Sequence, residues 1–270
     1  MLEPEAQVCV VIVNWNGRED TLACLRSVSA APEAGRIVVV DNGSEDDAVT
    51  AIHQEFPEVV VLEMGSNIGF AAANNAGAEF FLRETALPYL LLLNNDAFLE
   101  ADTLQRLTRA MADQVDVGIA APKTYYYPPP PVRLWYAGGA IDWKQGSCEH
   151  WGFGGLDRGQ YDVAKRVTFA PGAALLIRRA LVESIGLFDE RYFMFEEDVD
   201  LSIRAAKSGF GILYLPDAVV WHRVGRSANK RGNAFIWYHL VRNRLYTMHK
   251  HASRTQWLQF VLYFPILWLW

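Results

Sequence analysis

The feature that most constrains the fold is the stretch Leu87–Glu100, LPYLLLLNNDAFLE. Within it, Tyr89–Leu93 is a continuous apolar run of strand length, and three polar residues, Asn94, Asn95 and Asp96, end it abruptly. Such a run is typical of a strand that is buried on both faces of a parallel sheet. Ligands of open α/β sheets bind beyond the carboxyl ends of the strands, so Asp96 with its two amides suits a hard cation that carries phosphate oxygens. A polar turn in which Asp caps the next helix fits the same residues.

Apolar runs of strand length alternate with segments of helical periodicity through the first part of the chain. The expected strands are Val8–Val13, Arg36–Val40, Val59–Met64, Tyr89–Leu93 and Val117–Ala121, and the expected helices are Thr21–Ala30, Glu45–Phe56, Phe70–Arg83 and Ala101–Ala112. This alternation predicts an α/β fold with a mostly parallel, doubly wound central sheet flanked by helices. The apolar content of 51% allows a sizeable core and excludes global disorder.

The pattern breaks at residues 123–166, which are rich in Pro, Gly and aromatic residues. We interpret this segment as an irregular excursion with short strands, whose aromatic rings suit either a sugar site or a small satellite core. Regular patterns then return. Strand-like composition is found at Val167–Ile177, interrupted by a Pro-Gly pair, and at Phe210–Leu215 and Val219–Trp221, and helical composition at Arg178–Ile185, Leu201–Ser208 and Phe235–His251. We expect one domain over residues 1–222, followed by a basic helical and apolar C-terminal extension at 223–270.

The charge of the chain is unevenly spread. Eight of its 25 Lys and Arg residues lie after residue 220, and all 31 acidic residues lie before it. The last segment, Trp257–Trp270, is almost wholly apolar but is shorter than the roughly 20 residues that span a bilayer. A basic helix before such a segment favours peripheral contact with an anionic membrane surface, although a helix packed on the core or a dimer contact also fits. Because the main body is acidic, nucleic acid is not an expected partner.

The cysteines indicate the compartment. Cys9, Cys24 and Cys148 are odd in number and lack the spacing of a metal site, and the acidic start MLEPEAQ shows no signal peptide. We therefore expect reduced thiols in a cytoplasmic protein, peripheral at the inner face of the plasma membrane.

Polar residues suited to a nucleotide lie at the ends of the predicted strands. Asp41 follows the second strand and suits hydrogen bonds from a base or ribose, and Asn14 ends the first strand. Asn67, Gly69 and Asn74 lie at a loop-to-helix junction, where free backbone N–H groups can meet phosphate. Because the carboxyl ends of parallel strands share one edge of a sheet, these residues and Asp96 are predicted to form one nucleotide site.

A series of motifs, in this order, resembles the family 2 inverting glycosyltransferases. The motifs are VVIVNWNG, IVVVDNGSEDD, NIGFAAANNAG, LLLLNNDA, FAPGAALLIRR, GLFDERYFMFEEDVDLSIRAAKSGF and VVWHRVGRS. The resemblance covers about Val8 to Ser227 and is nearest to the rhamnosyltransferase-like branch that builds bacterial surface polysaccharides. It implies a GT-A fold, a nucleoside-diphosphate sugar donor with thymine or uracil as its base, a divalent cation (Mg²⁺ or Mn²⁺) and a glycan or lipid-linked acceptor.

The resemblance also implies roles at the donor side of the site. Asp41 matches the acid that contacts the nucleoside, and Asn94, Asn95 and Asp96 occupy the place of the DxD motif. Asp96 would bind the cation and Asn94 would approach the ribose. Since Asn94 replaces a carboxylate, cation binding should be weaker without the donor's diphosphate. His222 matches a position that ligates the metal in some relatives, while a strand-end histidine bonded to backbone is the alternative.

The catalytic side is implied by the segment Glu196–Asp200. The resemblance makes Asp198 the base that takes the acceptor's proton during a single inverting displacement, with Glu197 in a supporting role and Asp200 in a structural one. An acidic first turn of a helix is the alternative for these residues. Gly172 belongs to a loop that resembles the one shaping the sugar and acceptor pocket, where glycine allows close approach of backbone to ligand.

Two other classes of function fit parts of the sequence. A nucleotide-dependent oxidoreductase on a Rossmann sheet would carry GxGxxG after its first strand, which Asn14–Gly17 lacks. A non-catalytic, membrane-associated protein that binds sugar or nucleotide is favoured by Asn94 in place of an acid, but the presence of Asp96, Asp198 and His222 counts against it.

Overall fold

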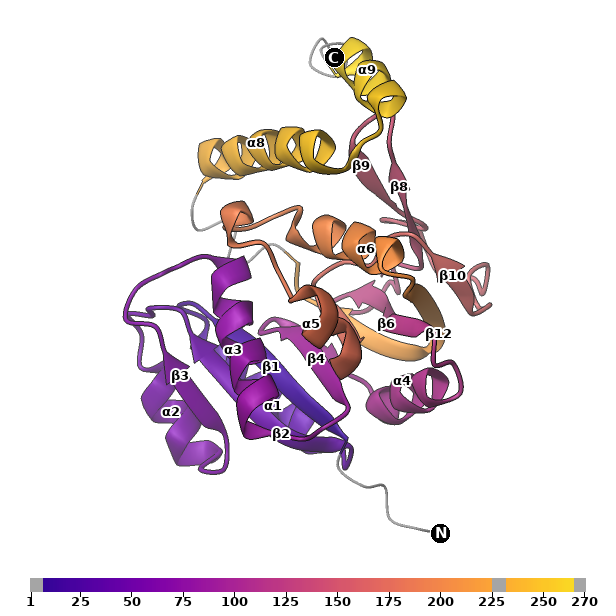
Figure 1. The fold of residues 1–270 in the computed structure, drawn as a ribbon. Coiled ribbons are helices and arrows are strands. Elements are labelled where there is room, and N and C mark those ends of the chain that lie inside the picture. Colours follow the sequence, from indigo (N-terminus) through magenta and orange to yellow (C-terminus); the bar gives the residue numbers. More distant parts are fainter. Residues whose placement is uncertain (1–6, 225–231, 265–270) are drawn as a thin grey trace.

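The computed structural model of the 270-residue chain describes residues 7–224 and 232–264, and every structural statement below concerns these residues. They form a three-layer structure in which helices cover both faces of one central sheet (Figure 1). The predicted α/β class with a mostly parallel sheet is confirmed. Three parts of the predictions lie outside the described residues: the acidic N-terminus, the end of the VVWHRVGRS motif and the last six residues of the apolar tail.

The main sheet has the strand order β10-β12-β6-β11-β4-β1-β2-β3, in which all strands except β10 and β11 run in the same direction. These strands are β1 (Val8–Asn14), β2 (Ala34–Asp41), β3 (Val60–Glu63), β4 (Tyr89–Asn94), β6 (Val117–Tyr126), β10 (Lys165–Val167), β11 (Ala174–Arg178) and β12 (Gly211–His222). Two shorter strands also belong to this sheet: β5 (Ala97–Leu99) pairs with β12, and β7 (Leu134–Tyr136) pairs with β6. A separate hairpin consists of β8 (Gly139–Asp142) and β9 (Ser147–His150).

The helices form a layer on each face of the sheet. One face carries α3 (Phe70–Glu84), α5 (Arg179–Ile185) and α6 (Glu197–Lys207), and the other carries α1 (Arg18–Ser29), α2 (Ala48–Glu55) and α4 (Thr103–Ala112). Successive residues of a strand point to opposite faces, so Leu90 and Leu92 pack toward α3 while Leu91 and Leu93 pack toward α1. Because helices cover both faces of the sheet, the side chains of β4 are buried on both sides. This explains why every residue of Tyr89–Leu93 is apolar instead of every second one.

The strand-like segment Val167–Ile177 is interrupted where its Pro-Gly pair predicts a break. Between β10 and β11 the chain turns toward α6, where Gly172 N–H donates to Asp198 Oδ2 at 2.8 Å. Conversely, Phe210–Leu215 and Val219–Trp221 belong to a single strand, β12, whose register shifts between Leu215 and Val219. Pro216 lies in this irregularity, where a residue without an N–H is tolerated.

The C-terminal part forms two helices, α8 (Asn233–His251) and α9 (Arg254–Tyr263). Helix α8 lies across the top of the molecule in Figure 1, and α9 continues beside the β8–β9 hairpin. Phe260 of α9 is fully buried, and the Nζ of Lys144 in the hairpin lies 4.6 Å from the ring centroid of Tyr263. Within residues 7–224 and 232–264, none of the helices has the length and apolarity needed to cross a bilayer.

Candidate active site

A pocket of about 400 Å³ opens at the edge of the sheet where β1, β4 and β12 end. This volume lies in the range of sites for small molecules. Its lining comes from the end of β4, the segment before β11, the turn before α6, the end of β12, the β8–β9 hairpin and α8. Among the predicted residues, those that line it are Asn67, Asn94, Asn95, Asp96, Gly172, Glu197, Asp198 and His222.

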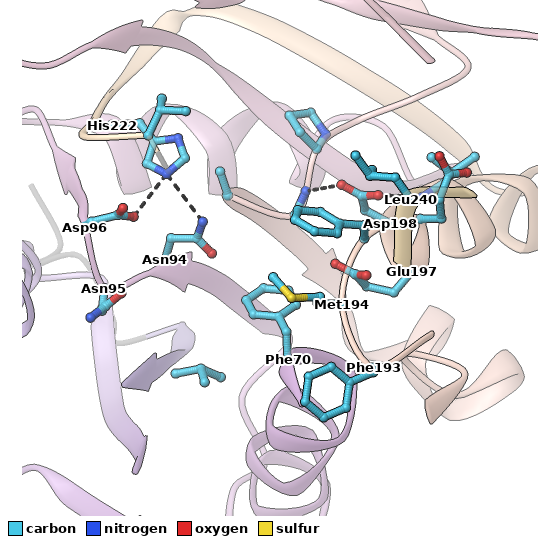
Figure 2. A pocket seen from close by; sticks show the side chains of 18 of the residues that line it. Phe70, Asn94, Asn95, Asp96, Phe193, Met194, Glu197, Asp198, His222 and Leu240 are labelled. Carbon is cyan, nitrogen blue, oxygen red and sulfur yellow. Dashed lines mark hydrogen bonds and ion pairs between the residues drawn. The ribbon is translucent and has the colours of Figure 1, made fainter. Parts of the chain in front are cut away.

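The end of β4 and the end of β12 bring an acid and an imidazole together. Asp96 Oδ1 lies 3.0 Å from His222 Nε2, and both side chains are buried. The Nδ2 of Asn94 lies 3.4 Å from the same nitrogen, while Asn94 Oδ1 is buried with no hydrogen-bond partner among the described residues. Figure 2 shows the three side chains converging on one side of the pocket.

This group fits a divalent cation that has few protein ligands. The described residues contain no cluster of three or more His, Cys, Asp or Glu side chains that could hold a metal ion by themselves. Mg²⁺ is commonly held by one or two carboxylates together with substrate phosphates. Asp96 and His222, with the unpaired carbonyl of Asn94 beside them, therefore match a cation that arrives with a diphosphate.

On the opposite side of the pocket, the acidic residues at the start of α6 point inward (Figure 2). Asp198 accepts hydrogen bonds from Gly172 N–H at Oδ2 and from Val199 N–H at Oδ1, both at 2.8 Å. Burial raises the pKa of Asp198, and these N–H groups oppose the rise. The pKa of Glu197 is raised well above its ordinary value by burial and by the charge of Asp198, and Glu197 Oε2 is buried without a partner in the described structure.

The neighbouring acids differ in their surroundings. Burial raises the pKa of Glu196 to about 8, although the charge of Arg244 opposes the rise. Asp200 is fully buried and lies 2.6 Å from Arg204 Nε, 2.7 Å from Lys250 Nζ and 2.7 Å from His251 Nε2. Burial alone would raise the pKa of Asp200, but these partners hold it below its ordinary value. Asp200 therefore joins α6 to α8, which agrees with a structural role.

Four predicted donor residues, Asn14, Asp41, Gly69 and Asn74, are not among the residues that line the pocket, whereas Asn95 lines it with its amide turned toward Thr21. Asn14 Nδ2 donates to Asp41 Oδ1 at 2.9 Å, and Asn14 Oδ1 accepts from the Thr21 hydroxyl at 2.8 Å. The amide of Asn95 donates to Thr21 Oγ1 at 3.1 Å and so points away from the Asp96–His222 pair. Asn74 is buried and donates to the Phe70 carbonyl within α3. Donor contacts of these residues stay predictions.

The loop before α3 is arranged around Asn42, which the sequence did not single out. Asn42 Oδ1 accepts from Ile68 N–H at 2.9 Å, and Asn67 Oδ1 accepts from Gly69 N–H at 3.1 Å. Gly69 has φ +95°, and a Cβ there would lie 2.6 Å from the ring of Phe193. Only glycine therefore fits where this loop meets the turn before α6.

The excursion contributes an aromatic wall to the pocket, which is one of the two roles that its composition suggested. Trp135 lies edge-on to His222, with 4.8 Å between ring centroids, and also contacts His150. Trp135, Cys148 and His150 all line the pocket. The aromatic content of residues 123–166 was the available signal, but it fits a satellite core equally well, and only the fold of the β8–β9 hairpin decides between them.

Comparison with known proteins places the chain in a family. The model of the family described as "Glycosyltransferase like family 2" matches residues 4–242. The N-acetylglucosaminyl-diphospho-decaprenol L-rhamnosyltransferase of Mycobacterium tuberculosis is 26% identical over 260 residues, covering 90% of this chain and 85% of that protein. The dTDP-rhamnosyl transferase RfbF of Shigella flexneri is 23% identical, covering 83% and 72%.

Solved structures share the fold. GalNAc-T7 with UDP, GalNAc and Mn²⁺ superposes with a TM-score of 0.66 at 18% identity, over 81% of this chain and 44% of that chain. The mannosyltransferase PcManGT from Pyrobaculum calidifontis, in complex with GDP-Man and Mn²⁺, gives a TM-score of 0.64 at 18% identity, over 97% and 68%. These likenesses confirm the predicted GT-A fold, and the match over residues 4–242 shows that the chain belongs to glycosyltransferase family 2.

Proposed function

We propose that the chain transfers a sugar, with inversion, from a nucleoside-diphosphate donor to a hydroxyl of a glycan or lipid-linked acceptor, and that the reaction depends on Mg²⁺ or Mn²⁺. The observation that carries the proposal is that the Asp96–His222 pair and the Asp198 carboxylate lie on opposite sides of one pocket. An inverting displacement needs this arrangement, because the attacking hydroxyl and the leaving diphosphate lie on opposite faces of the anomeric carbon.

In the proposed reaction, Asp198 takes the proton of the acceptor hydroxyl while that oxygen bonds to the anomeric carbon. The bond between the anomeric carbon and the diphosphate oxygen breaks in the same step, and the diphosphate leaves with its electron pair. A cation held by Asp96 and His222 would supply stabilisation of the negative charge on the diphosphate. The N–H groups of Gly172 and Val199 fix the orientation of the Asp198 carboxylate.

The names of two relatives support rhamnose as the sugar to test first, and one of these names includes a dTDP donor. A UDP donor is the alternative. The relative from Mycobacterium tuberculosis has a lipid-linked acceptor in its name, which supports an acceptor of that class. Much of the pocket wall is apolar, including Phe70, Trp135 and Phe169. Such a wall suits the apolar faces of sugar rings and the methyl group of a 6-deoxy sugar.

The test is hydrolysis of a panel of nucleotide sugars by the purified chain, with Mn²⁺, with Mg²⁺ and with chelator. We expect release of nucleoside diphosphate from dTDP-rhamnose or a UDP-sugar only when a cation is present. The configuration of the sugar linkage in the transfer product, read by NMR, then tests inversion. Binding of a donor without turnover of any donor or acceptor would indicate a non-catalytic binding protein instead.

We also propose that the C-terminal helices make peripheral contact with an anionic membrane surface. Helix α8 exposes Tyr238 and Leu245, and α9 exposes Leu258, Val261 and Leu262, with exposed fractions of 38–67%. No acidic residue occurs after residue 220, whereas the exposed cations of the two helices include Arg242 and Arg254. Apolar and cationic side chains on one segment complement an anionic lipid surface, and α8 also lines the pocket through Leu240.

A further inference from the structure

The turn from Tyr192 to Glu196 delivers the acidic residues of α6 to the pocket, and its backbone is irregular. Phe193, Phe195 and Glu196 have φ angles of +54°, +68° and +70°, which are uncommon for residues other than glycine. The carbonyl of Glu196 accepts from Asp200 N–H of α6 and that of Tyr192 accepts from Met194 N–H, but no backbone N–H of the described residues donates to the carbonyls of Met194 and Phe195. Carbonyls held away from water need hydrogen-bond partners, so a side chain from outside the turn has to supply them.

That partner is Asn243 of α8. Its Nδ2 donates to the carbonyl oxygens of Tyr192, Met194 and Phe195 at 2.8, 2.8 and 2.9 Å, and the residue is fully buried. An amide has two N–H groups, so one of them is shared between two of the three carbonyls. Arg242 Nη1 donates to Asn243 Oδ1 at 2.8 Å, which fixes the amide with its NH₂ group toward the turn.

The neighbouring residues on the same face of α8 pack against the turn as well. His239, one helical turn before Asn243, stacks on the ring of Phe193 with 5.3 Å between centroids. Thr247, one turn after it, lies 2.9 Å from the Tyr192 hydroxyl through Oγ1. The carbonyl of Phe193 points the other way and accepts from Ala71 N–H of α3 at 3.2 Å. The turn is therefore fastened on two sides.

We propose that Asn243 is a positioning residue for the transfer step, which rests on the function proposed above. By holding three carbonyls of the turn, it fixes the direction in which Glu197 and Asp198 enter the pocket. The Asp96–His222 pair comes from β4 and β12, so Asn243 acts on the acceptor side and leaves the cation side in place. Helix α8 thus influences the transfer step through Asn243.

The test replaces Asn243 and separates the rate of transfer from donor binding. Asn243→Ala removes both donors, and Asn243→Asp keeps the shape but presents a carboxylate to three carbonyls. We expect each to lower kcat by about 10²-fold, the effect of misplacing a catalytic group by about 1 Å. Donor affinity with cation, measured by calorimetry, should stay within about twofold of the parent value. Asn243→Ser retains one donor and should give an intermediate kcat.

The matched control is Met248→Ala, on the same helix. Met248 is 2% exposed and packs near Gly146, away from the turn. The Met248→Ala substitution should lower the free energy of unfolding, while kcat stays within about twofold of the parent value. The proposal is overturned if Asn243→Ala, or Asn243→Ser where the alanine variant does not fold, has the same kcat as Met248→Ala. It is also overturned if donor affinity falls as far as kcat.

A second measurement does not depend on turnover. The amide of Asp200 donates to the Glu196 carbonyl at 2.9 Å, so its hydrogen exchange reports on the end of the turn. Exchange of peptides covering residues 193–200 should be faster in Asn243→Ala than in Met248→Ala. Equal exchange in the two variants overturns the positioning role. The two proposals fail in different ways. If the parent turns over no donor but exchange is still faster in Asn243→Ala, the proposed function is wrong, while Asn243 still fixes the turn.

Discussion

His222 Nε2 lies 3.0 Å from Asp96 Oδ1, although 126 positions of sequence separate the two residues. The pairing of β12 with β5 produces this contact, because His222 is directly opposite Ala97 in that ladder. Backbone pairing therefore holds the last residue of β12 beside Asp96, the residue that precedes β5, and Arg223 N–H donates to the Asp96 carbonyl at 2.9 Å. A site built this way keeps its geometry before any ligand arrives, which lowers the cost of binding.

Asp96→Ala should abolish the dependence of donor binding on the cation while the fold survives. The variant removes the carboxylate that we propose as ligand, and chelator should have the same effect on the parent protein. The measurement is calorimetry of the nucleotide sugar with and without Mn²⁺. Asp113→Ala is the control, because this exposed acid lies at the end of α4 and does not line the pocket. Equal affinity of the parent with and without the cation would contradict the proposed role of Asp96.

Asp198→Asn should keep donor and cation affinity and lower the transfer rate by a factor on the order of 10²–10⁴, the usual contribution of a general base. The variant is nearly isosteric but does not take up the proton. Glu197→Gln should have a milder effect. Because burial raises the pKa of Asp198, transfer by the parent should rise with pH as this carboxyl loses its proton. Near-parent rates in Asp198→Asn, together with an inactive Glu197→Gln that still binds donor, would move the base to Glu197.

Glu196→Gln should weaken the fall of stability with rising pH. Burial raises the pKa of Glu196 from 4.5 to about 8, so within this window the folded protein keeps a proton that the unfolded chain has released. The free energy of unfolding then decreases as pH rises. We expect the Tm of the parent to fall more steeply than that of the variant between about pH 5 and pH 8. The control is Glu183→Gln, because the side chain of Glu183 is 54% exposed. Equal slopes of Tm against pH in the parent and in Glu196→Gln would contradict the raised pKa of Glu196.

Asp200→Asn should destabilise the fold by about 3–5 kcal/mol, because breaking a buried ion pair leaves its partners uncompensated. Asp200 is fully buried beside Arg204, Lys250 and His251, so the loss should also loosen α8 from α6. Urea unfolding measures the change. The exposed pair of Arg26 and Glu55 provides the comparison, and Glu55→Gln should destabilise the fold far less, because solvent screens an exposed pair. Similar costs for the two variants would show that Asp200 does not anchor the helices.

Leu258→Ser combined with Leu262→Ser should weaken binding to vesicles that contain phosphatidylglycerol by at least about tenfold, since two exposed leucines no longer enter the lipid. Co-sedimentation measures binding, with phosphatidylcholine vesicles to test the contribution of charge. Val115→Ser changes a residue that is 80% exposed between α4 and β6 and should leave binding unchanged. Equal binding of the leucine variant and the parent would rule out α9 as a contact surface.

The sheet was predictable because its signal is local. Tyr89–Leu93 and Val8–Val13 are apolar at every position, and only a strand buried on both faces requires this. The acids at the start of α6 and the pair of Asp96 with His222 followed from a resemblance that runs through most of the chain. The strands and the motifs were both recognisable because each is a run of consecutive residues.

The rest depends on contacts between distant segments. Asn243 looks like any polar residue of a helix, and its importance comes from a turn that lies 48 to 51 positions away. Trp135 reaches the pocket from β7 and His150 from β9, two short strands without a clear alternation of polar and apolar residues. Asp41 was expected to face a ligand, but its hydrogen bond with Asn14 is invisible in a sequence where both residues simply end strands.

The reversed direction of β11 has a consequence for the chemistry of the pocket. A strand parallel to β4 would begin at the far edge of the sheet, and only side chains at its end would reach the ligand. Because β11 runs antiparallel, its first residue, Ala174, is opposite Leu93 at the ligand edge. The residues just before β11 therefore lie at the ligand edge, and their backbone N–H groups are not used in strand pairing. One of them, the N–H of Gly172, donates a hydrogen bond to Asp198. The direction of β11 thus provides a backbone hydrogen-bond donor at a position where glycine has no side chain to provide one.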